Sequence, residues 1–224
     1  MRITSALVGA IALAGAAAAQ PAFAADGDQT PDQRWIVRLR AIAVEPTGST
    51  GPVEPSFPAA HTHVGGGYAP ELDFTYMATK HIGAELILGT TKHGISGRGS
   101  LDGMKVGHTR ALPPTLTLQY HFLPDAAIRP YVGAGVNYTI FYSSKASGAL
   151  QEAIGDTKLH LSDSFGYAVQ AGVDIDVTKK IFFNVDLKYI DMDTTAKLTT
   201  GSLVNRERVH IDPLVPSVGI GMRF

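Results

Sequence analysis

The sequence contains no cysteine, so no disulfide framework can hold the fold together. Charged residues make up only 17% of the 224 residues, and the formal net charge of −1 gives no general attraction to nucleic acid. Beyond the N-terminal region, no apolar run approaches the roughly 18 residues that a membrane-spanning helix needs. These absences exclude a disulfide scaffold, a basic nucleic-acid-binding domain and a helical bundle that spans a membrane.

The N-terminus has the layout of an export signal. Arg2 supplies a positive charge, and residues 3–19 are apolar and rich in alanine. Ala22 and Ala24 place small residues at the −3 and −1 positions of a cleavage site. We therefore predict a secretory signal peptide over residues 1–24. The alternative is an uncleaved anchor, for which this alanine-rich run is short, since a spanning helix needs about 20 apolar residues.

The rest of the chain, residues 25–224, is dominated by alternation of apolar and polar residues. Leu116 and Leu118, for example, alternate with Thr117 and Gln119. A period of two residues is typical of strands whose two faces meet different surroundings. The pattern predicts an all-β protein of eight strands, at 34–44, 71–77, 81–89, 114–122, 128–142, 165–177, 182–190 and 216–224.

The connections between these strands alternate in length. Short turns are expected around 79–80, 123–127 and 178–180. The other four connections are long, are enriched in Gly, Ser, Thr and Pro, and are interpreted as loops. This is the layout of an antiparallel transmembrane β-barrel with short periplasmic turns and long extracellular loops. An even strand number places both termini at the periplasmic end. The long connections are 45–67, 90–111, 143–164 and 194–209.

Alternation alone also fits a soluble lipocalin-like barrel, in which the apolar face points inward. Three features favour the inverted arrangement. The apolar faces carry no charge over their central stretches, and aromatic residues such as Tyr120, Tyr138 and Phe183 lie near strand ends, as in interfacial girdles. The polar faces are small and carry charges of both signs, which can compensate each other across a narrow lumen. The residues predicted to line the lumen are Arg38, Arg40, Glu71, Asp73, Glu85, Gln119, His121, Asn137, Asp174, Asp186, Lys188 and Arg223.

The last strand ends in Phe224, with Met222, Ile220 and Val218 on the same face. A terminal aromatic at the end of an alternating strand resembles the signal by which the barrel-assembly machinery recognises outer-membrane proteins. We therefore predict that Phe224 is an assembly signal.

Five stretches carry a resemblance to a known family: WIVRLRAIAVEP, FTYMATKHIGAELILGTTKHGI, LPPTLTLQYHF, RPYVGAGVNYTIF and DPLVPSVGIGMRF. Together they resemble the OmpW family of small outer-membrane proteins. The resemblance implies an eight-stranded barrel in the outer membrane of a Gram-negative cell, with a narrow channel that passes small hydrophobic molecules. The related alkane importer AlkL fits the same class of activity. By this resemblance, solutes enter from outside and leave sideways into the membrane, so the expected partners are outer-membrane lipid, small hydrophobic solutes and the assembly machinery.

A sideways exit requires an interrupted β-ladder, and proline cannot donate a ladder hydrogen bond. Pro113, Pro114, Pro130, Pro213 and Pro216 are candidate interruptions. They can equally mark strand starts or bulges. That interpretation is preferred for Pro113, and Pro216 is left open.

Two apolar residues in the long connections, Phe57 and Leu150, are candidates for a gate. No nucleophile, base and orienting group share a location, so no enzyme and no cofactor is predicted. His61 and His63 make half of a metal site, which is too few ligands to predict a metal. The alternative function is a structural or adhesive barrel that acts through its extracellular loops. The solute and the oligomeric state are left open.

Overall fold

The computed structural model describes residues 34–224. The predicted signal peptide, residues 1–24, lies outside the described residues and stays a prediction. Within the described part of the chain, no helix has the length and apolar character needed to cross a membrane.

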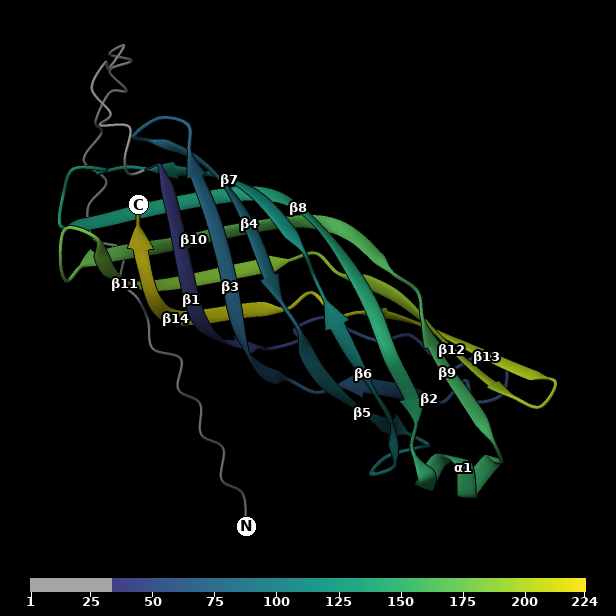
Figure 1. Ribbon diagram of the computed structural model, residues 1–224. Helices are drawn as coiled ribbons and strands as arrows, with labels where there is room; N and C mark the ends of the chain where they lie inside the picture. Colours follow the sequence, from purple (N-terminus) through teal and green to yellow (C-terminus); the bar gives the residue numbers. More distant parts are fainter. Residues whose placement is uncertain (1–33) are drawn as a thin grey trace.

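Eight antiparallel strands form a closed barrel (Figure 1). The ring closes because β10 pairs with β11 on one side and with β8 on the other. The predicted eight strands and their order are therefore confirmed. In ring order the strands are β1 (Trp35–Val44), β3 (Gly67–Met77), β4 (Ile82–Gly89), β7 (Thr115–His121), β8 (Ile128–Ala146), β10 (Ser164–Asp176), β11 (Ile181–Ile190) and β14 (Leu214–Arg223).

The apolar face of each barrel strand points outward. On β1, the side chain of Leu39 is 53% exposed, whereas that of its neighbour Arg40 is 1% exposed. Soluble monomers rarely expose a continuous apolar surface of this extent, so the belt suits lipid. The inversion excludes the lipocalin-like arrangement. Members of the belt include Leu39, Leu116, Leu118, Val136, Tyr167, Phe183, Val185, Leu187, Val218 and Ile220.

The long connections have more regular structure than the sequence indicated. They hold six further strands and one short helix, which continue the barrel wall at the end opposite to the C-terminus (Figure 1). We call this part the extension. Its elements are β2 (Ala60–Val64), β5 (Thr91–Gly99), β6 (Lys105–Leu112), α1 (Gly148–Ile154), β9 (Thr157–Leu161), β12 (Asp193–Thr200) and β13 (Leu203–His210).

The composition of the extension strands explains why the sequence pattern does not reveal them. On β5, Ile95 is buried while Lys92 and Gly94 on the opposite face are exposed, so the period of two persists. Its buried face also carries Thr91 and His93, which blurs the contrast between the faces. Water can solvate the outer face, so no row of large apolar residues marks these strands.

The barrel and the extension share one long strand. β8 runs for 19 residues, and its first part pairs with β7 while its later part pairs with β6. The first and last strands pair with each other, and at the other end of the barrel the Trp35 and Phe224 backbones exchange hydrogen bonds of 2.9 Å. Phe224 directly follows β14, and its role as an assembly signal stays a prediction.

Candidate functional site

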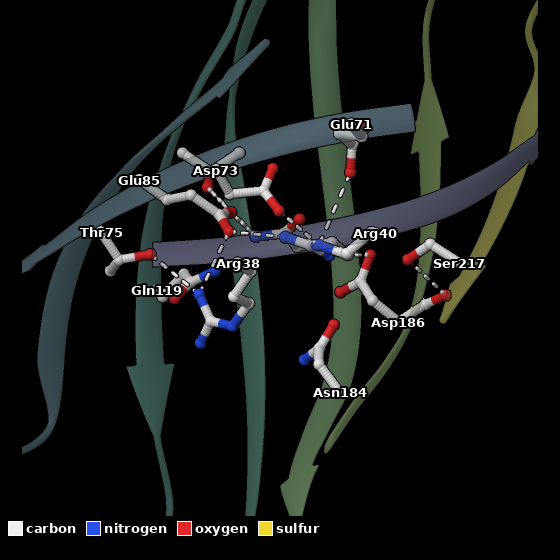
Figure 2. A network of polar contacts seen from close by, with 12 residues as sticks. Arg38, Arg40, Glu71, Asp73, Thr75, Glu85, Gln119, Asn184, Asp186 and Ser217 are labelled. Atoms are coloured by element: carbon white, nitrogen blue, oxygen red, sulfur yellow. Dashed lines mark hydrogen bonds and ion pairs between the residues drawn. The ribbon is translucent and has the colours of Figure 1, made fainter. Parts of the chain in front are cut away.

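The lower lumen, on the side of the C-terminus, is filled by charged side chains from several strands (Figure 2). Arg40 on β1 is the centre of this network. Its Nη2 lies 2.8 Å from Glu85 Oε1, its Nη1 lies 3.2 Å from Asp186 Oδ1, and its Nε contacts both Asp73 and Glu71. Four carboxylates from β3, β4 and β11 therefore converge on one guanidinium group. A planar guanidinium presents five donors in a fixed fork, which suits such convergence.

Arg38 lies two residues earlier on the same face of β1. Its Nη2 is 3.0 Å from Asp174 Oδ2, and its Nη1 donates to Thr75 Oγ1 at 2.9 Å and lies 3.4 Å from Glu85 Oε1. The guanidinium carbon also lies 5.2 Å from the centroid of the Tyr131 ring. Glu85 thus joins the two arginines into a single network across the lumen.

The remaining predicted lumen residues also point inward. His121 Nε2 contacts Gln119 Oε1 at 3.1 Å, and Asn137 donates to Thr115 Oγ1 at 2.8 Å. Lys188 contacts both oxygens of the Glu71 carboxylate at 3.1 Å. Arg223 lies nearer the barrel mouth with a partly exposed side chain. The structure therefore places all twelve side chains inside the barrel, and their part in a solute path stays a prediction.

The sequence analysis missed the groups that close the lower mouth. Phe182 is fully buried, and the guanidinium carbon of Arg223 lies 4.4 Å from its ring centroid. Arg129 and Arg223 both contact the carboxylate of Asp176. Phe182 lies on the same face of β11 as the predicted Asp186 and Lys188, so the period of two could have identified it.

The network makes a plug. Each of its cations contacts at least one carboxylate, and removal of one partner of a buried ion pair typically costs about 3–5 kcal/mol. Eight strands also leave an interior that side chains fill. The lower lumen therefore offers no straight water-filled channel, and an apolar molecule would have to separate these charges to pass through it.

Above the plug lies an apolar cavity, which we call the chamber. Its floor is the ion pair of Glu71 and Lys188. The chamber is small, with a volume of about 40 Å³, which is room for only a few water molecules at about 10–15 Å³ each. The lining side chains must therefore shift to admit a larger molecule. The apolar lining residues are Ile42, Val44, Val64, Ile87, Ala111, Phe141, Leu161, Ile190, Met192, Ile211 and Val215, together with Pro113 and Pro213.

One buried histidine belongs to the chamber wall. His93 on β5 contacts the Gly65 carbonyl oxygen through Nδ1 at 2.9 Å and Thr91 Oγ1 through Nε2 at 2.7 Å. Burial lowers the pKa of His93 below its ordinary value. The ring is therefore neutral at pH 7 and adds no charge to the apolar chamber.

The β-ladder is interrupted beside this chamber. The pairing of β4 with β7 ends at Ile87 opposite Thr115, and that of β5 with β6 begins at Thr91 opposite Ala111. Among the described residues, no ladder pair joins 88–90 to the facing 112–114. Two of the three facing residues are prolines, which have no N–H to donate. We call this interruption the seam.

The seam connects the chamber wall with the lipid-facing surface. Gly89 and Pro113 both line the chamber, while Leu88 on the outer face is exposed. Pro113 lies between the end of β6 at Leu112 and the start of β7 at Thr115, so it marks a strand boundary as well as the interruption. Thr90 Oγ1 shares a 2.6 Å hydrogen bond with the hydroxyl of Tyr142, which lies on β8 beyond the 112–114 side, so this bond spans the seam.

The other candidate prolines interrupt the ladder less. Pro130 pairs with Val173, and Pro216 pairs with Leu187 on β11. On the β1 side, pairing with β14 stops at Ser217 and resumes at a bridge to Leu214, so Pro216 lies in a gap of two positions. The carbonyl oxygen of Pro213 accepts a 3.2 Å hydrogen bond from the Ile190 backbone N–H. Pro113 and Pro114 thus border the longer gap, which spans three positions.

The two candidate gate residues lie together in the extension. Phe57 and Leu150 both line a second apolar pocket, whose other lining residues include Val53, Met104 and Ile154. Helix α1 carries Leu150, and its backbone N–H donates to the Ser147 hydroxyl that caps the helix. A gate role for this pair stays a prediction.

The profile of the OmpW family matches residues 33–224, which includes every described residue. The chain belongs to the OmpW family. Outer membrane protein W of Escherichia coli is 42% identical over 156 residues, which cover 68% of this chain and 71% of that protein. The crystal structure of the outer membrane protein OprG from Pseudomonas aeruginosa matches with a TM-score of 0.80 and 31% identity, over 86% of this chain and 96% of that one.

A third relative carries a name that refers to metabolism. The dibenzothiophene metabolism operon protein PahQ of Pseudomonas aeruginosa is 32% identical over 158 residues, which cover 68% of this chain and 69% of that protein. Taken together, the barrel, its apolar belt and this family membership make the chain an outer-membrane β-barrel. The extension then lies on the extracellular side, and the plug lies toward the periplasm.

Proposed function

We propose that this barrel is a passive conduit that takes small apolar molecules from outside the cell into the outer membrane. One observation carries the proposal. The apolar chamber is sealed below by the plug and is bordered at the seam by Gly89 and Pro113, where strand pairing stops. A solute in the chamber therefore has an exit into lipid that separates no charges.

The entrance lies in the extension. A solute first meets the pocket of Phe57 and Leu150 and then the chamber. Each step removes apolar surface from water, which is favourable by about 25 cal/mol per Å². No energy source is needed, because the solute moves from water to protein and then to hydrocarbon.

The sideways exit is favoured over a straight path. To enter the periplasm directly, a solute would have to break ion pairs such as those of Arg40, at a cost of about 3–5 kcal/mol for each uncompensated charge. At the seam, three facing positions on each side make no ladder hydrogen bonds with each other, and the outer surface there is formed by the apolar residues Leu88, Leu112 and Pro114. Opening the seam therefore requires movement of side chains and breakage of the hydrogen bond between Thr90 and Tyr142.

The solute class is a hydrocarbon or an aromatic compound of similar size. The narrow chamber supports a thin or flat molecule over a bulky one. The name of the PahQ relative, which refers to dibenzothiophene metabolism, supports the same class for a protein of this family.

The test is uptake of a radiolabelled aromatic hydrocarbon by cells that lack or carry the protein at matched levels. The variant A111W adds an indole ring to the chamber wall, and we expect it to reduce uptake at least tenfold. The variant V136L changes a lipid-facing residue of the belt and serves as the matched control with normal uptake. Equal uptake with and without the protein would overturn the proposal.

A second exit variant tests the seam itself. The double substitution P113T/P114T restores two backbone donors on the side facing residues 88–90, so the ladder can continue across the seam. We expect slower uptake with an unchanged barrel, as judged by heat-modifiable migration on a gel. Unchanged uptake in this variant together with a loss in A111W would place the exit elsewhere in the wall.

One observation favours a second function, that of an adhesive or structural barrel. The β12–β13 hairpin projects beyond the barrel wall, and Leu203 near its tip is 45% exposed (Figure 1). A projecting hairpin suits contact with a partner, because binding residues are concentrated on surface connections that a rigid scaffold positions. Replacement of residues 200–204 by a short Gly-Ser turn should abolish such adhesion and leave uptake unchanged.

A further inference from the structure

Charge is distributed unevenly around the rim where the apolar belt ends and the extension begins. On the wall formed by β4 and β5, the outward side chains run from Leu86 and Leu88 through Thr90 to Lys92. On β6, the first outward charged residue above Leu112 is Arg110. Along each strand, the outward side chains therefore change from apolar to charged over two to four residues.

Three exposed cations gather at this rim on β5, β6 and β8. Lys92 lies directly opposite Arg110, and Lys145 lies opposite His108 on the neighbouring strand pair. Residues directly opposite have Cβ atoms about 4.5–5.5 Å apart, and like charges in such a pair are destabilising. We call Lys92, Arg110 and Lys145 the basic arc.

The basic arc has no counter-charge of its own. Within residues 34–224, none of its three side chains forms an ion pair or a hydrogen bond. By contrast, Arg98, farther out on β5, pairs with Asp102. The arc therefore keeps an unrelieved repulsion that a bound anion would remove.

The opposite side of the rim is acidic. On β11 and β12 the outward residues run from Tyr189 to Asp191 and Asp193, and Asp212 lies just before β14. Partial burial, and then the neighbouring Asp212 and Asp193, raise the pKa of Asp191. The rim is thus basic on one side and acidic on the other. A uniformly solvated surface would show both signs interspersed.

We propose that the basic arc binds the phosphate-bearing headgroup of a glycolipid in the outer leaflet of the membrane. The arc lies at the edge of the belt, where headgroups meet acyl chains, and clusters of Lys and Arg at this level attract anionic lipids. The exposed Leu88 and the half-buried Leu112 below the arc, together with the exposed Tyr142 ring beside Arg110, offer an apolar surface to the acyl chains. A soluble anion would gain the charge contacts but not this second surface.

The position of the arc has a structural consequence for the seam. Lys92 and Arg110 each lie two residues from Thr90 and Leu112, which border the seam. A lipid held by the arc therefore lays its chains along the outer face of the seam. This inference rests on the outer-membrane location and not on the proposed conduit.

The experiment measures binding of diphosphorylated lipid A, its dephosphorylated form and inorganic phosphate to the purified full-length protein in detergent, by native mass spectrometry. We expect the diphosphorylated lipid to bind much more tightly than the dephosphorylated one. The variant K92Q/R110Q/K145Q should weaken its binding about 100-fold, since each basic residue near an anionic surface contributes a several-fold factor.

Two matched variants separate the site from general charge. K158Q/K197Q/R206Q removes the same number of cations from the β9, β12 and β13 sheet and should bind as the unaltered protein does. K92R/R110K/K145R keeps the charges and should retain binding, which would show that the first variant did not fail by misfolding. Equal binding by the arc variant, equal loss in the β9–β12–β13 variant, or displacement by equimolar inorganic phosphate would each overturn the proposal.

Discussion

The two halves of the lumen are built from the same strands and by the same alternation, yet they differ in chemistry. On β1, the inward residues after Ile36 at the lower mouth are Arg38 and Arg40 in the lower half and Ile42 and Val44 in the upper half. On β11, the inward series likewise begins at Phe182 in the lower mouth and then passes from Asn184 to Ile190. The period of two decides only that a residue lies inside. Its height along the strand decides whether it belongs to the plug or to the chamber.

The largest effect is expected from removal of the central cation of the plug. In R40M the four carboxylates around that position lose their shared counter-charge, which should destabilise the barrel by about 3–5 kcal/mol. Urea unfolding in lipid vesicles, followed by the fluorescence of Trp35, the only tryptophan in the sequence, measures this. R40K keeps the charge and should lose less. A change below about 1 kcal/mol for R40M would show that the plug is not held by this residue.

The next effect comes from making the upper half resemble the lower half. The variant I42N places an amide in the chamber, where a buried polar group without a partner costs about 1–3 kcal/mol. We expect uptake of an aromatic hydrocarbon to fall at least fivefold while the barrel still folds. A41N at the adjacent, outward position is the control for the substitution itself. Normal uptake by I42N would mean that solutes bypass the chamber.

The smallest effect is expected at the seam. Y142F removes the hydroxyl that binds Thr90, and a hydrogen bond of this kind contributes about 0.5–1.5 kcal/mol. If the bond restrains opening, uptake should rise a few-fold. Y138F is the matched control, because Tyr138 lies on the same strand and donates its hydroxyl to Asp163 instead. An equal rise in both variants would point to the membrane interface and not to the seam.

Much of the barrel could be predicted from the sequence, because lipid on one side and a charged lumen on the other produce strong contrast along each strand. The alternation of Leu116, Leu118 and Tyr120 with Thr117 and Gln119 identifies β7 without structural information. The extension strands were missed because water solvates their outer faces and Thr91 and His93 enter their buried faces.

The chamber was missed for a different reason. Ile42 and Val44 share the inward face with the predicted Arg38 and Arg40, so the sequence did carry the signal. Polarity marks the inward residues of the plug, but it does not mark the inward residues of an apolar chamber. The meeting of Phe57 and Leu150 in one pocket could not be derived, because it depends on how α1 and the connection after β1 fold over the barrel.

The pairing of the first strand with the last has a consequence for how the molecule is made. Arg38 and Arg40 belong to the first strand that the described residues form, whereas Asp174 and Asp186 leave the ribosome more than a hundred positions later. The arginines cannot be neutralised by these acids until β14 meets β1 beside Phe224. An incomplete chain therefore keeps hydrated charges that oppose its entry into hydrocarbon. These charges become buried only when the chain includes β14 and the ring closes. We therefore expect a chain that terminates before β14 to stay outside the bilayer.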